Sequence, residues 1–152
     1  MNIEFCFAWH EAKRPLRRSF KLPGTFELFE EYRARISKFT SAEAGGIPDL
    51  ETIRKSGSKI WICHTSKESK TLSSEKIAER LDHLKSTGVR KLYILIGGAD
   101  GFSTEQVRNW SPDLLWNFGP MTLPHELAAV VAGEQIYRAW TILHGLPYHS
   151  GH

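Results

Sequence analysis

The chain has 152 residues, 41% of them hydrophobic, with 20 basic and 17 acidic side chains and a formal net charge of +3. This length and composition predict a single folded α/β domain over residues 1–152 and are not those of a disordered chain. The sequence has no apolar run of about eighteen residues, and Glu4 interrupts the short hydrophobic segment at the N-terminus. We therefore expect no membrane span and no signal peptide, and a cytoplasmic location.

Residues 1–9 alternate between hydrophobic and polar side chains and predict a half-buried strand. The hydrophobic side of this strand consists of Ile3, Phe5 and Phe7. A loop follows, ending at Pro23-Gly24, and Thr25 can then cap a helix that reaches about Phe39.

The next segments are shorter and less regular. Residues 44–46 break the helical pattern, residues 48–55 fit a short helix, and residues 56–58 fit a turn. Residues 59–65 predict a second strand, and the polar run 66–70 predicts a loop after it.

The second half of the chain repeats the order of helix and strand. A helix is expected from Ser73 to Gly88, and the continuous apolar run 92–96 is typical of a strand covered on both faces. A glycine-rich loop over 97–101 follows at once. Ser103 and Gln106 form a possible capping box for a short helix that ends before Pro112. Residues 114–118 predict a further short strand.

The longest helical pattern occupies the C-terminal part of the chain. Thr122 and Pro124 are start signals and Gly145 is a stop signal, so about twenty residues would form a rod of roughly 30 Å. Apolar residues lie on more than one side of this helix, beside a strip of small residues at Ala129 and Gly133. Two interpretations are open: a central core helix, or a core helix that also contacts a second subunit across the small residues.

Alternating strands and helices predict a mostly parallel sheet with helices on both faces. In such folds ligands bind beyond the carboxyl ends of the strands. Three loops leave such ends, beginning at Thr65, at Gly97 and at Phe118. The loop over 118–123 has many main-chain groups and few bulky polar side chains, so it can wrap an adenine-sized ring.

Other chemistry is weakly supported by the sequence. The glycine loop lacks the spacing of a dinucleotide fingerprint and of a nucleotide-triphosphate loop, so a tight turn is the simpler interpretation. Cys6 and Cys63 lie in strand-like runs, and we expect buried free thiols. The C-terminal histidines His144, His149 and His152 lack metal-ligand spacing, so we expect no metal.

Two charged features leave alternatives open. Five cations lie within nine residues without an acid among them: Lys13, Arg14, Arg17, Arg18 and Lys21. They indicate either a solvated loop or a patch that faces a polyanion. Glu134 and Arg138 have the spacing of a helix ion pair, although an arginine on so apolar a helix could instead face an anionic ligand.

Four stretches taken together resemble the SPOUT superfamily of methyltransferases, and within it the RlmH type. They are Leu95-Ile96-Gly97-Gly98-Ala99-Asp100-Gly101, Met121-Thr122-Leu123-Pro124-His125, Glu134-Gln135-Ile136-Tyr137-Arg138-Ala139 and Pro147-Tyr148-His149. The similarity is strong from about Leu72 to His149 and weaker but collinear before that. Members of this family are bacterial enzymes that methylate N3 of a pseudouridine in 23S ribosomal RNA of the large subunit.

The resemblance implies a C-terminal deep trefoil knot, a homodimer and S-adenosylmethionine as the cofactor. The cofactor-binding residues it implies are Thr65, Gly97, Phe118, Gly119, Pro120, Met121, Thr122 and Leu123. The catalytic or substrate-side residues it implies are His125, Arg138, Tyr148 and His149, with the C-terminal tail reaching across the dimer. His149 or His125 would take the proton, Arg138 would stabilise an anion, and Tyr148 would stack on or hydrogen-bond the flipped base.

One departure from the family concerns RNA contacts. Ala129 stands where the family usually has an arginine, and the cations between Lys13 and Lys21 could replace that contact from another side. Two alternatives to the leading hypothesis are a noncatalytic RNA- or ribosome-binding dimer with the same fold, and a SPOUT methyltransferase that acts on another RNA. Neither a membrane nor a metal is expected among the partners.

Overall fold

The computed structural model describes residues 1–55 and 57–150. Within this part of the chain, one six-stranded sheet has all its strands parallel and in the order β2-β1-β5-β3-β6-β4. The strands are β1 (Asn2–Phe7), β2 (Ala42–Gly45), β3 (Lys59–Cys63), β4 (Lys70–Thr71), β5 (Lys91–Ile96) and β6 (Leu114–Asn117). The predicted turn over 56–58 includes Ser56, which is outside the described residues.

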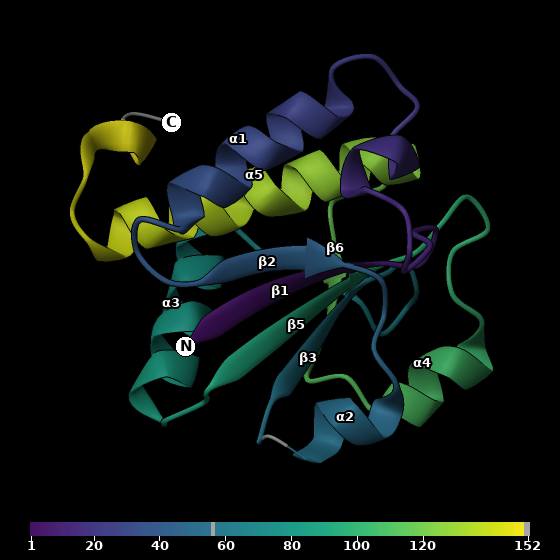
Figure 1. The fold of residues 1–152 in the computed structure, drawn as a ribbon. Helices are drawn as coiled ribbons and strands as arrows, with labels where there is room; N and C mark the ends of the chain where they lie inside the picture. Colours follow the sequence, from purple (N-terminus) through teal and green to yellow (C-terminus); the bar gives the residue numbers. More distant parts are fainter. Residues whose placement is uncertain (56, 151–152) are drawn as a thin grey trace.

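Helices cover both faces of this sheet, as the alternation of the sequence predicts. The helices are α1 (Thr25–Ile36), α2 (Leu50–Lys55), α3 (Ser74–Ser86), α4 (Thr104–Trp110) and α5 (His125–Leu143), with short 3-10 turns η1 (Leu16–Ser19) and η2 (Pro147–His149). Helices α1 and α5 lie side by side over one face, while α2 and α4 lie against the other (Figure 1). Helix α3 packs on α5 in the same layer as α1.

The two hydrophobic clusters follow the alternation of side chains along the central strands. In β1, Ile3, Phe5 and Phe7 belong to the cluster beneath α1, α3 and α5, whereas Cys6 belongs to the opposite cluster. The side chains of β5 alternate in the same way, so this strand is buried on both faces. The predictions for both strands are confirmed.

Helix α5 is a central core helix, and its strip of small residues is used within the chain. Ala129 is 0% exposed, and Gly133 is also buried. A Cβ atom at Gly133 would lie 3.4 Å from the Phe29 ring and 3.6 Å from Tyr32 Cβ, both on α1. Of the two interpretations of this helix, the added subunit contact across the strip is wrong, because α1 of the same chain already covers it.

Several predicted details of the elements are also wrong. Residues 42–45 form the edge strand β2 instead of a break, and Lys70–Thr71 forms β4 within the predicted loop. Thr122 caps nothing, because α5 begins at His125 after Pro124 without a side-chain cap. Thr25 is the first residue of α1 and does not cap it. The capping box of Ser103 and Gln106 on α4 is confirmed.

Candidate functional site

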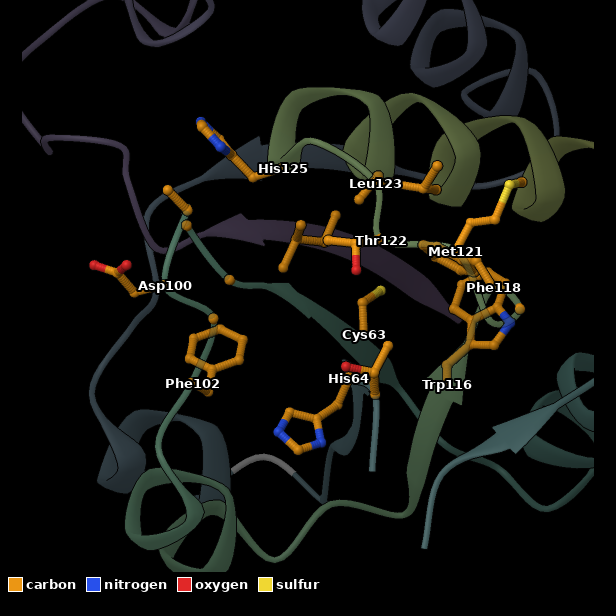
Figure 2. A pocket seen from close by; sticks show the side chains of 18 residues that line it. Cys63, His64, Asp100, Phe102, Trp116, Phe118, Met121, Thr122, Leu123 and His125 are labelled. Atoms are coloured by element: carbon orange, nitrogen blue, oxygen red, sulfur yellow. The ribbon is translucent and has the colours of Figure 1, made fainter. Parts of the chain in front are cut away.

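Three loops at the carboxyl ends of neighbouring strands line one cavity of about 390 Å³. They follow β3, β5 and β6, which are adjacent in the sheet order, and the first residue of α5, His125, completes the rim. Figure 2 shows side chains from all three loops around this cavity. The prediction that the strand-end loops form a single ligand-sized site agrees with this geometry.

The two ends of the glycine loop after β5, Gly97 and Gly101, lie close together. The Gly101 amide donates a hydrogen bond of 2.9 Å to the Gly98 carbonyl, which closes a tight turn. A Cβ atom on Gly97 would lie 3.0 Å from Gly101 Cα, whereas one on Gly98 would have Trp9 Cβ as its nearest neighbour, at 3.9 Å. The turn therefore requires glycine at position 97 for steric reasons.

The side chain of Asn117 fixes the conformation of the loop after β6 through two hydrogen bonds. The Gly119 amide donates to Asn117 Oδ1 at 2.8 Å, and Asn117 Nδ2 donates to Ser69 Oγ at 3.1 Å. Gly119 has a φ of +117°, a conformation that side chains rarely adopt. Trp116 and Phe118 meet edge to face with ring centroids 4.8 Å apart. This loop presents main-chain groups and aromatic surface to the cavity.

The structure places most of the predicted cofactor residues at this cavity. The predicted residues that line it are Thr65, Gly97, Phe118, Gly119, Met121, Thr122 and Leu123, together with His125 from the catalytic set. Pro120 is not among the lining residues. Met121 is 75% exposed and forms part of the open side.

Sequence reasoning missed two polar residues of the cavity, His64 and Asp100. The Nδ1 atom of His64 is buried and has no hydrogen-bond partner among the described residues. Both residues adjoin predicted positions, since His64 precedes Thr65 and Asp100 lies in the glycine loop. The predicted free thiol of Cys63 also lines the cavity, and burial raises its pKa, so the thiol is not a ready nucleophile.

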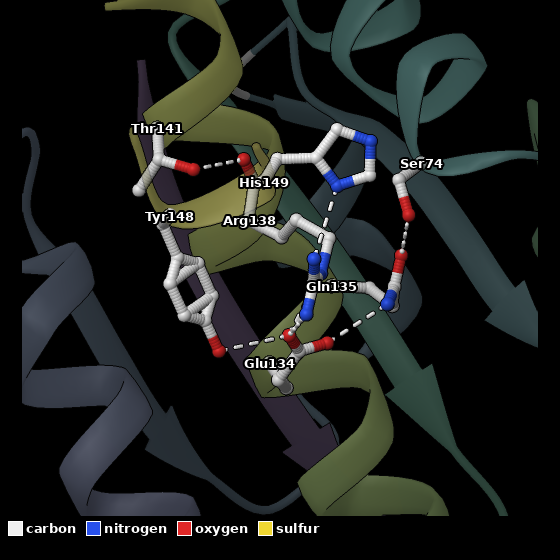
Figure 3. Close-up of polar contacts among 7 residues, drawn as sticks. All are labelled: Ser74, Glu134, Gln135, Arg138, Thr141, Tyr148 and His149. Atoms are coloured by element: carbon white, nitrogen blue, oxygen red, sulfur yellow. Dashed lines mark hydrogen bonds and ion pairs between the residues drawn. The ribbon is translucent and has the colours of Figure 1, made fainter. Parts of the chain in front are cut away.

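A polar cluster lies at the other end of α5 (Figure 3). Arg138 forms the predicted ion pair with Glu134, with Nη2 and Oε1 2.7 Å apart and each side chain 18% exposed. The Tyr148 hydroxyl donates to the same Glu134 oxygen at 3.0 Å. His149 lies 3.0 Å from Arg138 through Nδ1 and 2.7 Å from Glu75 of α3 through Nε2. The C-terminal turn η2 is thereby fixed to its own chain.

The electrostatics of this cluster favour a cation beside a protonated phenol. The hydrogen bond with Glu134 raises the pKa of Arg138 further above its ordinary value. Burial raises the pKa of Tyr148, and the charge of Glu134 raises it more, so the hydroxyl remains a donor at neutral pH. The hydrogen bond to His149 lowers the pKa of the Glu75 carboxyl. The cluster therefore presents a guanidinium under a neutral aromatic ring, with Arg138 Cζ 4.8 Å from the Tyr148 centroid.

The four residues of the predicted catalytic set do not come together within one chain. His125 is the first residue of α5 and lines the cavity, while Arg138, Tyr148 and His149 form the cluster near the other end. His125 and Arg138 are thirteen positions apart on the helix, which corresponds to roughly 20 Å. Within one chain the cavity and the cluster are therefore two separate sites.

The part of the chain that the structure describes holds neither a metal-binding cluster nor a membrane-spanning helix. No group of three or more His, Cys, Asp or Glu side chains in it is arranged to hold a metal ion. None of its helices combines the length and the apolar character needed to cross a membrane.

Comparison with known proteins decides the family. A family profile described as "Predicted SPOUT methyltransferase" matches residues 21–149 of the chain. The chain belongs to the SPOUT methyltransferase family. Two relatives, each named "Ribosomal RNA large subunit methyltransferase H", come from Koribacter versatilis and Deinococcus deserti. The first is 36% identical over 82% of this chain and 88% of its own, the second 37% identical over 93% and 86%.

Solved structures share the fold of this SPOUT methyltransferase. A probable methyltransferase from Bordetella pertussis Tohama I has a TM-score of 0.55 at 11% identity, over 91% of this chain and 95% of its own. A probable methylase family protein from Haemophilus influenzae Rd KW20 has a TM-score of 0.56 at 9% identity, over 98% and 69%. The family predicted from the four sequence stretches is confirmed, and so is the α/β fold with its parallel sheet.

Proposed function

We propose that this SPOUT methyltransferase transfers a methyl group from S-adenosylmethionine to ribosomal RNA of the large subunit, at N3 of a pseudouridine. The observation that carries the proposal is the convergence of three strand-end loops on one cavity beside His125. The names of the relatives support the choice of RNA, because both act on the large subunit by name. The family resemblance supports the choice of nucleotide.

The residues of the cavity fit this cofactor. Its volume of about 390 Å³ is within the range of small-molecule sites. Phe118 and Leu123 offer apolar surface for an adenine ring, and the tight turn at Gly97 lets a ligand approach the main chain. Asp100 is an acid available to the cationic parts of the cofactor, and the buried Nδ1 of His64 lacks a partner among the described residues. When bound, S-adenosylmethionine supplies an activated methyl group.

The work left to the protein is alignment and proton removal. The target nitrogen must be held in line with the methyl group and water must be excluded. The N3 proton must leave, and His125, on the rim of the cavity, is one candidate base. His149 is the other, and it would have to release its hydrogen bond from Arg138 before Nδ1 could take the proton. Arg138, positioned by its ion pair with Glu134, would stabilise the anionic ring, and Tyr148 would stack on the base.

A homodimer would bring the two halves of this site together. Because Arg138 and His125 of one chain lie roughly 20 Å apart along α5, we propose that the cluster of one subunit faces the cavity of the other. In this arrangement the tail of Tyr148 and His149 acts across the subunit boundary. We also propose that the C-terminal part of the sheet forms the deep trefoil knot that the family resemblance implies. Because its proposed substrate is ribosomal RNA, we propose a cytoplasmic location for the protein.

We also propose that residues 1–152 work as one domain, although the family profile begins at residue 21. The support comes from β1, which lies inside the sheet between β2 and β5. Without this strand the other two would lose their shared neighbour.

The decisive experiment combines cofactor binding with product mapping. Calorimetric titration should show S-adenosylmethionine binding to the folded protein, and labelled methyl groups should reach ribosomes that lack the modification. Mapping the labelled nucleotide to a pseudouridine of the large subunit would support the proposal. Folded protein that binds no cofactor would favour a noncatalytic RNA-binding dimer, and label on another RNA would favour a different substrate.

A further inference from the structure

The basic segment between Lys13 and Lys21 lies beside the cofactor cavity. A groove of about 440 Å³ is lined by four residues of this segment, two ring side chains and two acids: Arg14, Arg18, Ser19, Lys21, Trp9, His125, Glu11 and Glu126. His125 lines both this groove and the cofactor cavity, so the two open next to each other. A molecule lying in the groove would therefore reach the edge of the proposed methyl-transfer site.

The segment is folded onto the domain through its polar and aromatic contacts. It forms the 3-10 turn η1 after Pro15. Trp9 Nε1 donates a 2.9 Å hydrogen bond to the Ser19 carbonyl, and His10 Nδ1 lies 2.6 Å from Ser19 Oγ. Phe20 packs edge to face on Phe7 of β1, with centroids 5.5 Å apart. The backbone from Pro15 to Phe20 therefore has a defined position on the surface, and its cationic side chains extend from it.

Glu126 fixes the end of the segment to the first turn of α5. This side chain is 3% exposed, and its Oε1 accepts hydrogen bonds from the amides of Lys21 and Leu22 at 2.8 and 2.9 Å. The Thr25 hydroxyl lies 2.8 Å from the same oxygen. Since Glu126 directly follows His125, the basic segment is positioned relative to the rim of the cavity.

Most of the positive charge of the segment is available to a ligand. The exposed side chains of Lys13, Arg18 and Lys21 form no ion pair with any residue in the ranges 1–55 and 57–150. Arg14 pairs with Glu11 at 3.0 Å and Arg17 with Glu27 at 2.7 Å. Both pairs are mostly exposed, and such pairs exchange readily because they contribute little free energy.

We propose that the segment from Lys13 to Lys21 is a docking surface for the phosphate backbone of the RNA substrate. The inference rests on the proposed function, because it takes the RNA from there and adds where its backbone lies. Clustered cations next to an open groove suit a chain of phosphates, whose condensed counterions they displace. The surface holds the strand so that the target base reaches the cavity at His125.

The test compares two variants that lose the same charge. Arg18→Gln/Lys21→Gln removes two cations from the groove, and Lys38→Gln/Arg90→Gln removes two exposed cations that line neither the groove nor the cofactor cavity. Affinity for large-subunit ribosomal RNA is measured over a range of salt concentrations. The groove variant should bind about tenfold more weakly near 0.1 M salt, and the magnitude of its salt slope should fall by about 1.4 to 1.8.

The control variant should keep the affinity and slope of the wild type to within about twofold. Both variants should keep cofactor affinity, the thermal midpoint and the turnover rate at saturating RNA, so that the loss appears in KM alone. If the wild type transfers methyl groups but the two variants have equal RNA affinities and equal salt slopes, the inference about the docking surface is overturned and the proposed function stands. A wild type without methyl transfer would instead overturn the proposed function, and the RNA-binding comparison would still report on the groove.

Discussion

Gly97 and Gly98 are neighbours in the loop after β5, but the fold constrains them differently. A methyl group on Gly97 would press against the backbone of Gly101 at 3.0 Å, whereas one on Gly98 would find its nearest atom at 3.9 Å. We expect Gly97→Ala to displace the loop and lower the affinity for S-adenosylmethionine at least about tenfold, which is about 1.4 kcal/mol. Isothermal titration calorimetry measures the effect.

Gly98→Ala is the matched comparison for this substitution, since it adds the same methyl group one residue further along. We expect a smaller loss of affinity, because no backbone atom has to move. Unfolding midpoints of both variants show whether the domain is intact. An affinity loss that is equal in both would mean that the close approach to Gly101 is not what shapes the loop.

The buried carboxylate of Glu126 is stabilised by three hydrogen bonds. Burial raises the pKa of this carboxyl, but hydrogen bonds from the Leu22 and Lys21 amides and from Thr25 outweigh burial and leave the pKa below its ordinary value. Glu126→Gln removes the charge that these donors stabilise, and we expect a loss of about 1–3 kcal/mol in the free energy of unfolding at pH 7. Urea titration of both proteins measures it.

The sign of the pH dependence follows from the lowered pKa. The charged carboxyl stabilises the folded state fully above its unfolded pKa, near 4.5, and this contribution is lost as the pH falls through the folded value. The difference between wild type and Glu126→Gln should therefore shrink in acid. A difference that stays constant from pH 7 down to pH 3 would contradict the role assigned to the charge.

The role of Glu126 could not be predicted from the sequence. Its hydrogen-bond partners lie more than a hundred positions earlier in the chain, so no local pattern connects them. His64 was missed for a related reason, since its position at the cavity depends on which strands lie next to each other. Gly97 could be predicted, because a glycine run directly after a buried strand is a local signal.

At the scale of elements, Gly133 is the residue of α5 that faces Phe29 and Tyr32 of α1. Gly133→Ala would place a methyl group 3.4 Å from the Phe29 ring, at ordinary contact distance, and would remove a glycine from a helix interior. We expect a gain of up to about 1 kcal/mol in unfolding free energy. Gly133→Leu should instead lose about 1–3 kcal/mol through overpacking against α1.

Chemical denaturation measures the unfolding free energies of Gly133→Ala and Gly133→Leu. The decisive result is that the alanine variant is the more stable of the two. A leucine variant as stable as the wild type would mean that α1 does not cover this face of α5. The free energies would then favour the contact between subunits that the sequence suggested for the strip at Ala129 and Gly133.

Elements with strong patterns were predicted well, and elements defined by their neighbours were not. β5 is a continuous apolar run and α5 is a long, largely apolar helix, and the local order of apolar residues predicts both. β2 has the sequence Ala-Glu-Ala-Gly, which has little preference for a strand and becomes one by pairing with β1. Thr122 was misassigned as a cap, because α5 begins at His125 and Pro124 occupies the N-cap position.

At the scale of the whole molecule, the proposed dimer predicts complementation between inactive variants. Gly97→Ala damages the cavity and Arg138→Ala damages the cluster, and each is expected to lower turnover by at least about tenfold alone. In a mixed dimer, one of the two sites combines an intact cavity with an intact cluster. Equal co-refolding makes about half of the dimers mixed, so about a quarter of the wild-type activity should return.

Methyl-transfer assays on separate and co-refolded samples measure the recovery, with sedimentation used to confirm that both variants are dimeric. Activity of the co-refolded sample no higher than the mean of the separate variants would contradict a shared site. The cavity and the cluster would then have to act within one chain, which their separation along α5 does not favour.

The strand order has a consequence for how the chain reaches its native state. β1 pairs with β2 on one side, but its partner on the other side is β5, from Asn2 opposite Lys91 to Phe7 opposite Ile96, so this pairing cannot form until residue 96 has been synthesised. α5, which covers α1 and α3, comes still later. During synthesis the apolar faces of these early elements stay exposed until the last helix emerges. Folding should therefore be slow and largely post-translational, with a nascent chain that depends on chaperones for much of its length.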